Sequence, residues 1–88
     1  MPDMTGFTVA GNDSRLSIRC DFATSGNVVS AVEQKIQESK LDVKLKADKF
    51  NDDGVLTLLI GVVRATAYAV RNLIFDIINI LNAQRLTA

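Results

Sequence analysis

Two stretches of the chain alternate apolar and polar residues, which is the pattern of a strand with one buried and one solvent-facing side. The first stretch covers residues 15–22 and the second covers residues 41–48. Turn-forming residues adjoin both stretches, at residues 11–14 and 51–54, and the second turn contains the Asp-Gly pair that favours hairpins. The pattern therefore predicts a hairpin around each turn. The side chains predicted to face the core are Leu16, Ile18, Cys20, Phe22, Leu41, Val43, Leu45 and Ala47, and those predicted to face outward are Arg15, Ser17, Arg19, Asp21, Asp42, Lys44, Lys46 and Asp48.

Helical spacing follows each predicted hairpin. Val28, Val29, Val32 and Ile36 recur at intervals that place them on one side of an amphipathic helix of about three turns. Residues 61–85 are apolar around most of a helical circumference, so they predict one long helix that begins at Gly61 and is roughly 37 Å long.

The resulting element order is ββαββα, an α+β fold in a single domain of residues 1–88. We predict a four-stranded, mostly antiparallel sheet with both helices on one face and a long C-terminal helix. Residues 6–40 and 41–85 repeat the same hairpin-plus-helix plan, and residues 1–5 are expected to be disordered. Residues 55–60 are apolar on both faces apart from one threonine, which predicts a central strand or an interface.

The predicted long helix has two apolar rows, one more than its own sheet requires. The first row would cover the sheet, and the second would meet a second copy of the chain in a homodimer or higher oligomer. The alternative is that the helix is buried entirely against its own sheet, with its polar residues at the edge. The residues predicted to form the oligomer interface are Val62, Ala69, Phe75, Ile78 and Leu81.

The sequence of the apolar C-terminal half does not predict a membrane-spanning helix. Its longest uncharged run has ten residues, 54–63, whereas a spanning helix needs about 20. Arg64, Arg71 and Asp76 would also lie within the hydrocarbon. The single cysteine and the absence of a signal pattern predict a cytoplasmic protein without disulfides.

The residue inventory offers little for catalysis. The chain has no histidine, and its one cysteine, Cys20, is predicted to face the core, so we expect no enzyme activity, metal site or cofactor. Ten acidic and ten basic residues leave no net charge, which disfavours nucleic-acid binding as the main function. A basic patch on the outer sheet face is predicted to be a mixed, solvated surface; it comprises Arg15, Arg19, Lys44, Lys46 and Lys49, interrupted by Asp21, Asp42 and Asp48.

One polar cluster could bind a ligand. Arg64, Tyr68 and Arg71 recur at helical spacing with Asn72 adjacent, and two guanidinium groups beside an aromatic ring could hold a phosphate, a nucleotide or an acidic partner. The alternative is a polar edge that pairs with Asp76 or with carboxylates of the sheet.

We therefore expect a non-catalytic, homo-oligomeric binding protein, such as an inhibitor, adaptor or assembly subunit, that associates through its C-terminal helix. Binding of a small anion or nucleotide near the oligomer interface is the alternative function, and nucleic-acid binding by the outer sheet face is the least favoured. The expected partners are a second copy of the chain and, besides it, another protein or a small anionic ligand.

Overall fold

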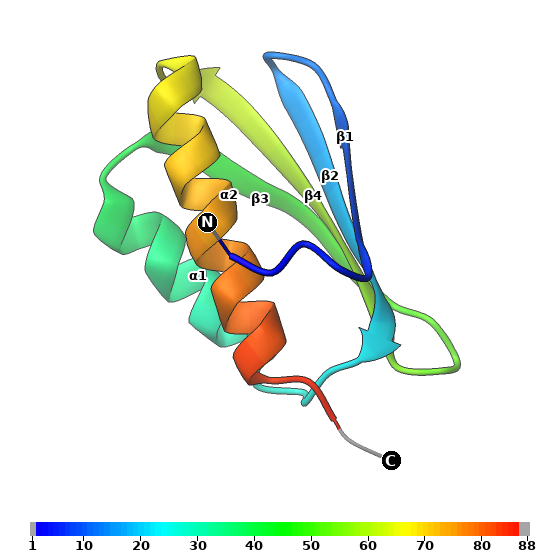
Figure 1. Cartoon of the computed structure of the whole chain (residues 1–88). Coiled ribbons are helices and arrows are strands. Elements are labelled where there is room, and N and C mark those ends of the chain that lie inside the picture. Colours follow the sequence, from blue (N-terminus) through cyan, green and yellow to red (C-terminus); the bar gives the residue numbers. More distant parts are fainter. Residues whose placement is uncertain (1, 87–88) are drawn as a thin grey trace.

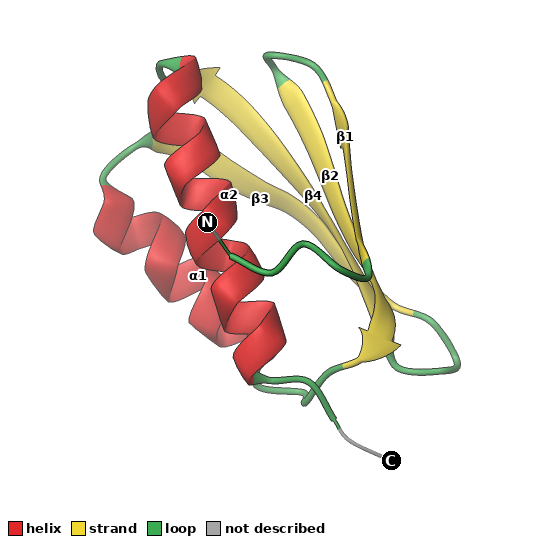
Figure 2. Ribbon diagram, viewed as in Figure 1, coloured by secondary structure: helices red, strands yellow, loops and turns green. Residues whose placement is uncertain are grey.

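A computed structural model describes residues 2–86 as one antiparallel sheet with two helices on one of its faces (Figure 1, Figure 2). The predicted α+β fold and its ββαββα order are confirmed. Met1, the first residue of the segment expected to be disordered, lies outside the described residues. The elements are β1 (Phe7–Gly11), β2 (Arg15–Ala23), α1 (Val28–Ser39), β3 (Asp42–Phe50), β4 (Val55–Arg64) and α2 (Ala67–Ala83).

The strand order in the sheet is β1-β2-β4-β3, and every neighbouring pair is antiparallel. β4 is therefore central, as its two apolar faces predicted. Ile18 of β2 lies opposite Leu58 of β4, and Ile60 of β4 lies opposite Leu45 of β3. Directly opposed residues point to the same side of a sheet, so this register places the apolar rows of three strands under the helices.

The core lies between the sheet and the two helices. Cys20 is buried in it as predicted, since only 1% of its surface is exposed. The first helix contributes Val28, Val32 and Ile36, three of the four residues of its predicted apolar stripe, as buried side chains. The core residues are Ile18, Cys20, Val28, Val32, Ile36, Val43, Leu56, Leu58, Ile60, Leu73, Ile77 and Leu81.

The prediction of one helix beginning at Gly61 is wrong, because β4 continues to Arg64 and α2 begins only after Thr66. Gly61 pairs with strands on both sides, opposite Arg15 and Lys44. These pairings extend the sheet through a segment whose apolar residues fit a helix or a strand equally well. α2 has 17 residues and is therefore about 25 Å long, not 37 Å. Neither described helix is both long and apolar enough to cross a membrane.

A bulge in β3 overturns part of its predicted alternation. The register with β4 shifts between Leu45 and Ala47, so one additional residue, Lys46, is accommodated in β3. Beyond the shift, Ala47 lies opposite Leu59 on the outer face and Asp48 lies opposite Leu58 on the helix side. The predicted directions of Ala47 and Asp48 are therefore reversed.

Residues 2–6, which precede β1, form no helix or strand and cross α2 (Figure 1). The side-chain amide of Asn82 donates a hydrogen bond of 2.9 Å to the backbone carbonyl of Asp3. The backbone N–H of Phe7 donates to the carbonyl of Met4 at 3.1 Å, which turns the chain into β1.

Candidate functional site

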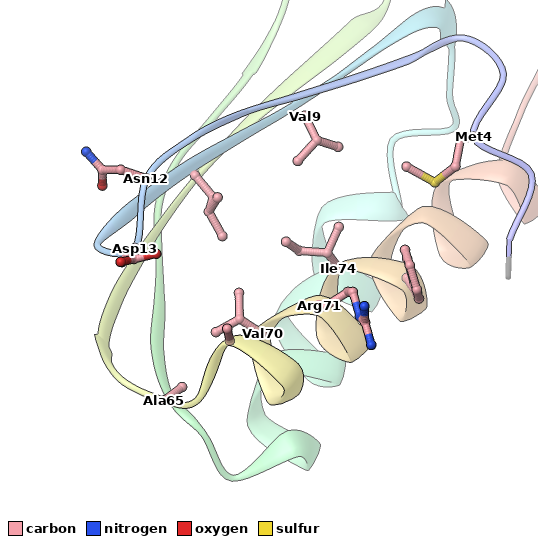
Figure 3. Close-up of a pocket in the computed structure, with 11 residues that line it drawn as sticks. Met4, Val9, Asn12, Asp13, Ala65, Val70, Arg71 and Ile74 are labelled. Carbon is pink, nitrogen blue, oxygen red and sulfur yellow. The ribbon is translucent and has the colours of Figure 1, made fainter.

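A cleft of about 470 Å³ opens between the first half of α2 and the β1–β2 hairpin (Figure 3). Its size is within the range of pockets that hold small ligands, about 300 to 1,000 Å³. The walls are mostly apolar, and Val9 of β1 faces Ile74 of α2 across the space (Figure 3). The lining residues come from the N-terminal segment (Met4), from the hairpin (Val9, Asn12, Asp13, Leu16) and from α2 and the residues just before it (Ala65, Ala67, Val70, Arg71, Ile74, Phe75).

Hydrogen bonds tie the C-terminal end of α2 and the residues after it to the end of β2 and the loop that follows, whereas the first half of α2 borders the cleft. At its C-terminal end, the Ser25 hydroxyl donates to the Gln84 side-chain oxygen at 2.6 Å, and the Leu86 N–H donates to the Ala23 carbonyl at 2.9 Å. On the sheet side, Val9 of β1 is 37% exposed and lines the cleft, whereas Ile18, its register partner on β2, is 0% exposed.

Hydrogen bonds within the turn shape the tip of the hairpin wall of the cleft. The Asn12 side-chain oxygen accepts hydrogen bonds from the backbone N–H groups of Ser14 and Arg15, both at 3.0 Å. Gly11 has a φ of +131°, a conformation that side-chain-bearing residues rarely adopt. This turn fixes the position of Asp13, which lines the cleft beside Asn12.

Among the described residues, Arg71 is the only basic one that lines the cleft. Its guanidinium carbon lies 5.4 Å from the centre of the Tyr68 ring, a cation–π arrangement. Within residues 2–86 the one ion pair joins Lys35 and Glu38, so Arg71 has no carboxylate partner there. Its charge is available to a group that enters the cleft.

The predicted ligand-binding cluster is only partly assembled. Tyr68, which is 67% exposed, and Arg71 lie together in the first half of α2. The prediction that Arg64 shares their helix face is wrong, because Arg64 ends β4 and lies opposite Asp42 of β3. Asn72 is an exposed residue of α2 and does not line the cleft.

The five residues predicted to form an oligomer interface occupy different environments. Ile78 and Leu81 are 0% and 1% exposed, so they belong to the interior of the chain itself. Val62 lies on β4, half-buried against the core, and Ala69 is a half-buried residue of α2. Phe75 is the one member of the set that lines the cleft.

The lining residues that the sequence did not single out come from segments far apart in the chain. The sequence pattern indicated only that Val9 and Leu16 are strand residues and that Met4 belongs to a disordered segment. No local pattern indicated that these residues lie near α2. Within residues 2–86, no three acidic or cysteine side chains gather closely enough to hold a metal ion. Comparisons with protein-family models, with curated proteins and with solved structures found no match to this chain.

Proposed function

We propose that the chain is a non-catalytic interaction protein that forms a two-fold homo-oligomer on the side where β1 meets the first half of α2. The observation that carries this proposal is the open apolar cleft beside an uncharged sheet edge. Each apolar side chain that a partner buries there stabilises the assembly by up to about 1.5–3 kcal/mol. Val9 and Phe75 are the central residues of this surface.

β1 is well suited to pair with a strand of another chain. It is an edge strand whose only partner within residues 2–86 is β2, so its other side carries backbone N–H and C=O groups without a strand partner there. The residues Phe7–Gly11 include no charge and no proline, and their register with β2 has no bulge. Two such strands that run antiparallel around a two-fold axis present identical surfaces to each other.

The first half of α2 supplies the area that β1 lacks. A stable interface of ordinary size buries about 800 Å² on each partner, more than one five-residue strand provides. Phe75, Val70 and Tyr68 lie on the adjoining part of α2, and the first two line the cleft. The proposed surface therefore differs from the predicted one: of the five predicted residues it keeps only Phe75, and it omits Val62, Ala69, Ile78 and Leu81. It gains Val9, Tyr68 and Val70.

Size-exclusion chromatography with light scattering tests the proposal, using two matched variants. Val9→Lys puts a charge on the proposed surface, and Val63→Lys, at a 62% exposed valine of β4, puts the same charge elsewhere. We expect the wild type and V63K to be dimers at micromolar concentration, and V9K to be a monomer of unchanged circular dichroism. A monomeric wild type, or equal dissociation of both variants, contradicts the proposal.

The cleft also supports a second candidate function, the binding of a small molecule with an apolar body and one acidic group. Arg71 favours this reading, because it lines an apolar cleft and has no ion-pair partner in the described part of the chain. A medium-chain carboxylate such as decanoate should then raise the melting temperature, inorganic phosphate should not, and Arg71→Gln should remove the effect. An equal shift with R71Q, or none with the wild type, rules out this ligand class.

A further inference from the structure

Both helices lie on one face of the sheet, and the outer face is turned away from them (Figure 2). The strands place half of the ten basic residues of the chain on this outer face. On β2, Arg15 and Arg19 alternate with the buried Ile18 and Cys20 and so point outward. Two lysines of β3 lie opposite outward-facing positions of β4, Lys44 opposite Gly61 and Lys49 opposite Thr57. The five basic residues of this outer basic face are Arg15, Arg19, Lys44, Lys46 and Lys49.

The bulge in β3 creates this charge pattern. In a regular strand, Lys44, Lys46 and Asp48 would share the outer face and Lys49 would point toward the helices. The register shift between Leu45 and Ala47 reverses the directions of Asp48 and Lys49. Lys49 therefore faces outward, and Asp48 faces the helix side. The bulge thus replaces a carboxylate with an ammonium group on the outer face.

Glycine at position 61 lets Lys46 lie flat on the outer basic face. A Cβ atom at Gly61 would come within 2.8 Å of the Lys46 Cε atom and 3.2 Å of its Cγ atom. The aliphatic stem of Lys46 therefore crosses the space that any larger residue would fill. Its ammonium group is added to the row formed by Lys44 and Arg15.

The basic side chains form two rows across the strands. Lys44 and Arg15 flank Gly61 in one row, and Lys49 and Arg19 flank Thr57 in the other. Arg15 and Arg19 are four residues apart on one strand, which separates the rows by about 13 Å. Between them lies a row of uncharged residues, Ala47, Leu59 and Ser17.

Few carboxylates oppose this charge. Among the described acidic residues, Asp21 is the one that alternates in phase with Arg15 and Arg19 on β2. Asp42 lies opposite Arg64 at the end of the sheet. The outer basic face thus carries a clear positive excess although the whole chain is neutral, and none of its five basic residues forms an ion pair with another residue of 2–86.

We infer that the outer basic face binds the phosphate backbones of a nucleic-acid duplex. The two rows lie about as far apart as the two edges of the major groove of B-DNA, about 12 Å, so each row can contact one backbone. The phenylalanines of the strands share the helix side: Phe7 and Phe22 belong to the core periphery, and Phe50 lies opposite the buried Leu56. The stacking platform typical of single-strand binders is therefore absent from this face of the described chain.

This interface contacts phosphates and reads no bases. A sheet presents no helix or loop that could enter a groove, so the contacts are sequence-independent and depend strongly on salt. With four or five phosphates neutralised, affinity for a duplex should fall roughly 100- to 500-fold between about 50 and 200 mM salt. Nucleic-acid binding was the least favoured prediction because the chain has no net charge. The net charge does not reveal that basic residues are concentrated on one face of the sheet.

Fluorescence anisotropy with a short labelled DNA duplex and its separate strands tests the inference. Lys44→Gln combined with Lys49→Gln removes one lysine from each row, and Lys35→Gln combined with Lys40→Gln removes two lysines from the α1 side. We expect the wild type to bind the duplex with the stated salt dependence. In K44Q/K49Q the slope of log affinity against log salt concentration should become shallower by about two, and in K35Q/K40Q the slope should change little.

Three results would overturn the inference. The first is that the protein does not bind the duplex at about 50 mM salt. The second is that both double variants lose duplex affinity equally, and the third is that the single strands bind more tightly than the duplex. Vesicles containing phosphatidylserine serve as a further arm, and binding to them without binding to the duplex assigns the face to a membrane surface instead. Since the outer basic face and the β1 edge are separate surfaces, V9K should retain duplex binding even if it abolishes self-association.

Discussion

The two halves of the chain repeat one plan but end in different sheet edges. In each half a hairpin precedes a helix, and the order β1-β2-β4-β3 places the second strand of each hairpin in the centre and the first at an edge. The centre is nearly symmetric, since Ile18 of β2 lies opposite Leu58 of β4 and both are 0% exposed.

The edges differ in length, charge and regularity. β3 has nine residues, two irregularities in its register and five charged side chains. Irregular register and charged side chains are the usual means by which an edge strand avoids pairing with another chain. β1 has five residues, no charge and no irregularity. The same plan therefore gives one half a protected edge that displays charge and the other half an open edge beside an apolar cleft.

The largest expected effect tests the symmetry of the centre. Ile18→Ala and Leu58→Ala each remove a fully buried side chain, so each should lower the free energy of unfolding by about 2–5 kcal/mol. Val63→Ala, at a 62% exposed position of β4 outside the proposed interface, serves as the control and should cost under about 1 kcal/mol. Urea denaturation measures all three. A loss confined to one of the two central positions would show that the halves do not share the core equally.

The second prediction compares the two hairpin turns. Gly54 has a φ of +78°, and a Cβ atom there would meet only the Ala23 Cβ at 3.4 Å, so Gly54→Ala should cost about 1–2 kcal/mol of backbone strain. Gly11 has a φ of +131°, and its added Cβ would collide with the carbonyl oxygen of Arg15. Gly11→Ala should therefore cost about 3 kcal/mol or more, because the turn itself must move.

Thermal unfolding of the two glycine variants gives the comparison directly. Equal losses would mean that the first turn can relax, and that the hairpin wall of the cleft is softer than its hydrogen bonds from Ser14 and Arg15 to Asn12 indicate.

The elements that the sequence predicted correctly are those in which one local pattern decides the structure. The alternation over residues 15–22 has a polar residue at every second position, and the Asp53-Gly54 pair marks the turn of the second hairpin without ambiguity. The first helix likewise follows from one stripe of buried residues. These local patterns were sufficient to predict the α+β fold.

The start of α2 and the cleft depend on information that is not local. Residues 55–63 are apolar at nearly every position, so the spacing of apolar residues cannot distinguish a strand from a helix there. Only the pairing of this segment with both β2 and β3 makes it a strand. Thr66 was the available signal, since a threonine before a helical stretch is a preferred cap.

The β3 bulge left no trace in the sequence, because Leu45, Lys46 and Ala47 alternate as a regular strand would. Its position follows from how nine residues of β3 are matched to β4. The outer basic face depends on that bulge, so composition and alternation alone predicted a mixed surface.

The smallest expected effect concerns how the two helices begin. The Thr66 side-chain oxygen accepts a hydrogen bond of 3.1 Å from the Ala69 N–H, whereas Asn27, at the same position before α1, makes no side-chain capping bond. Thr66→Ala should therefore lower the free energy of unfolding by about 1 kcal/mol, and Asn27→Ala by less than about 0.5 kcal/mol. Because Thr66 holds the end of α2 that borders the cleft, T66A should also weaken self-association, while N27A should not. Urea denaturation and light scattering on the same two samples measure both effects, and a larger stability loss in N27A would reverse the assignment of the capped helix.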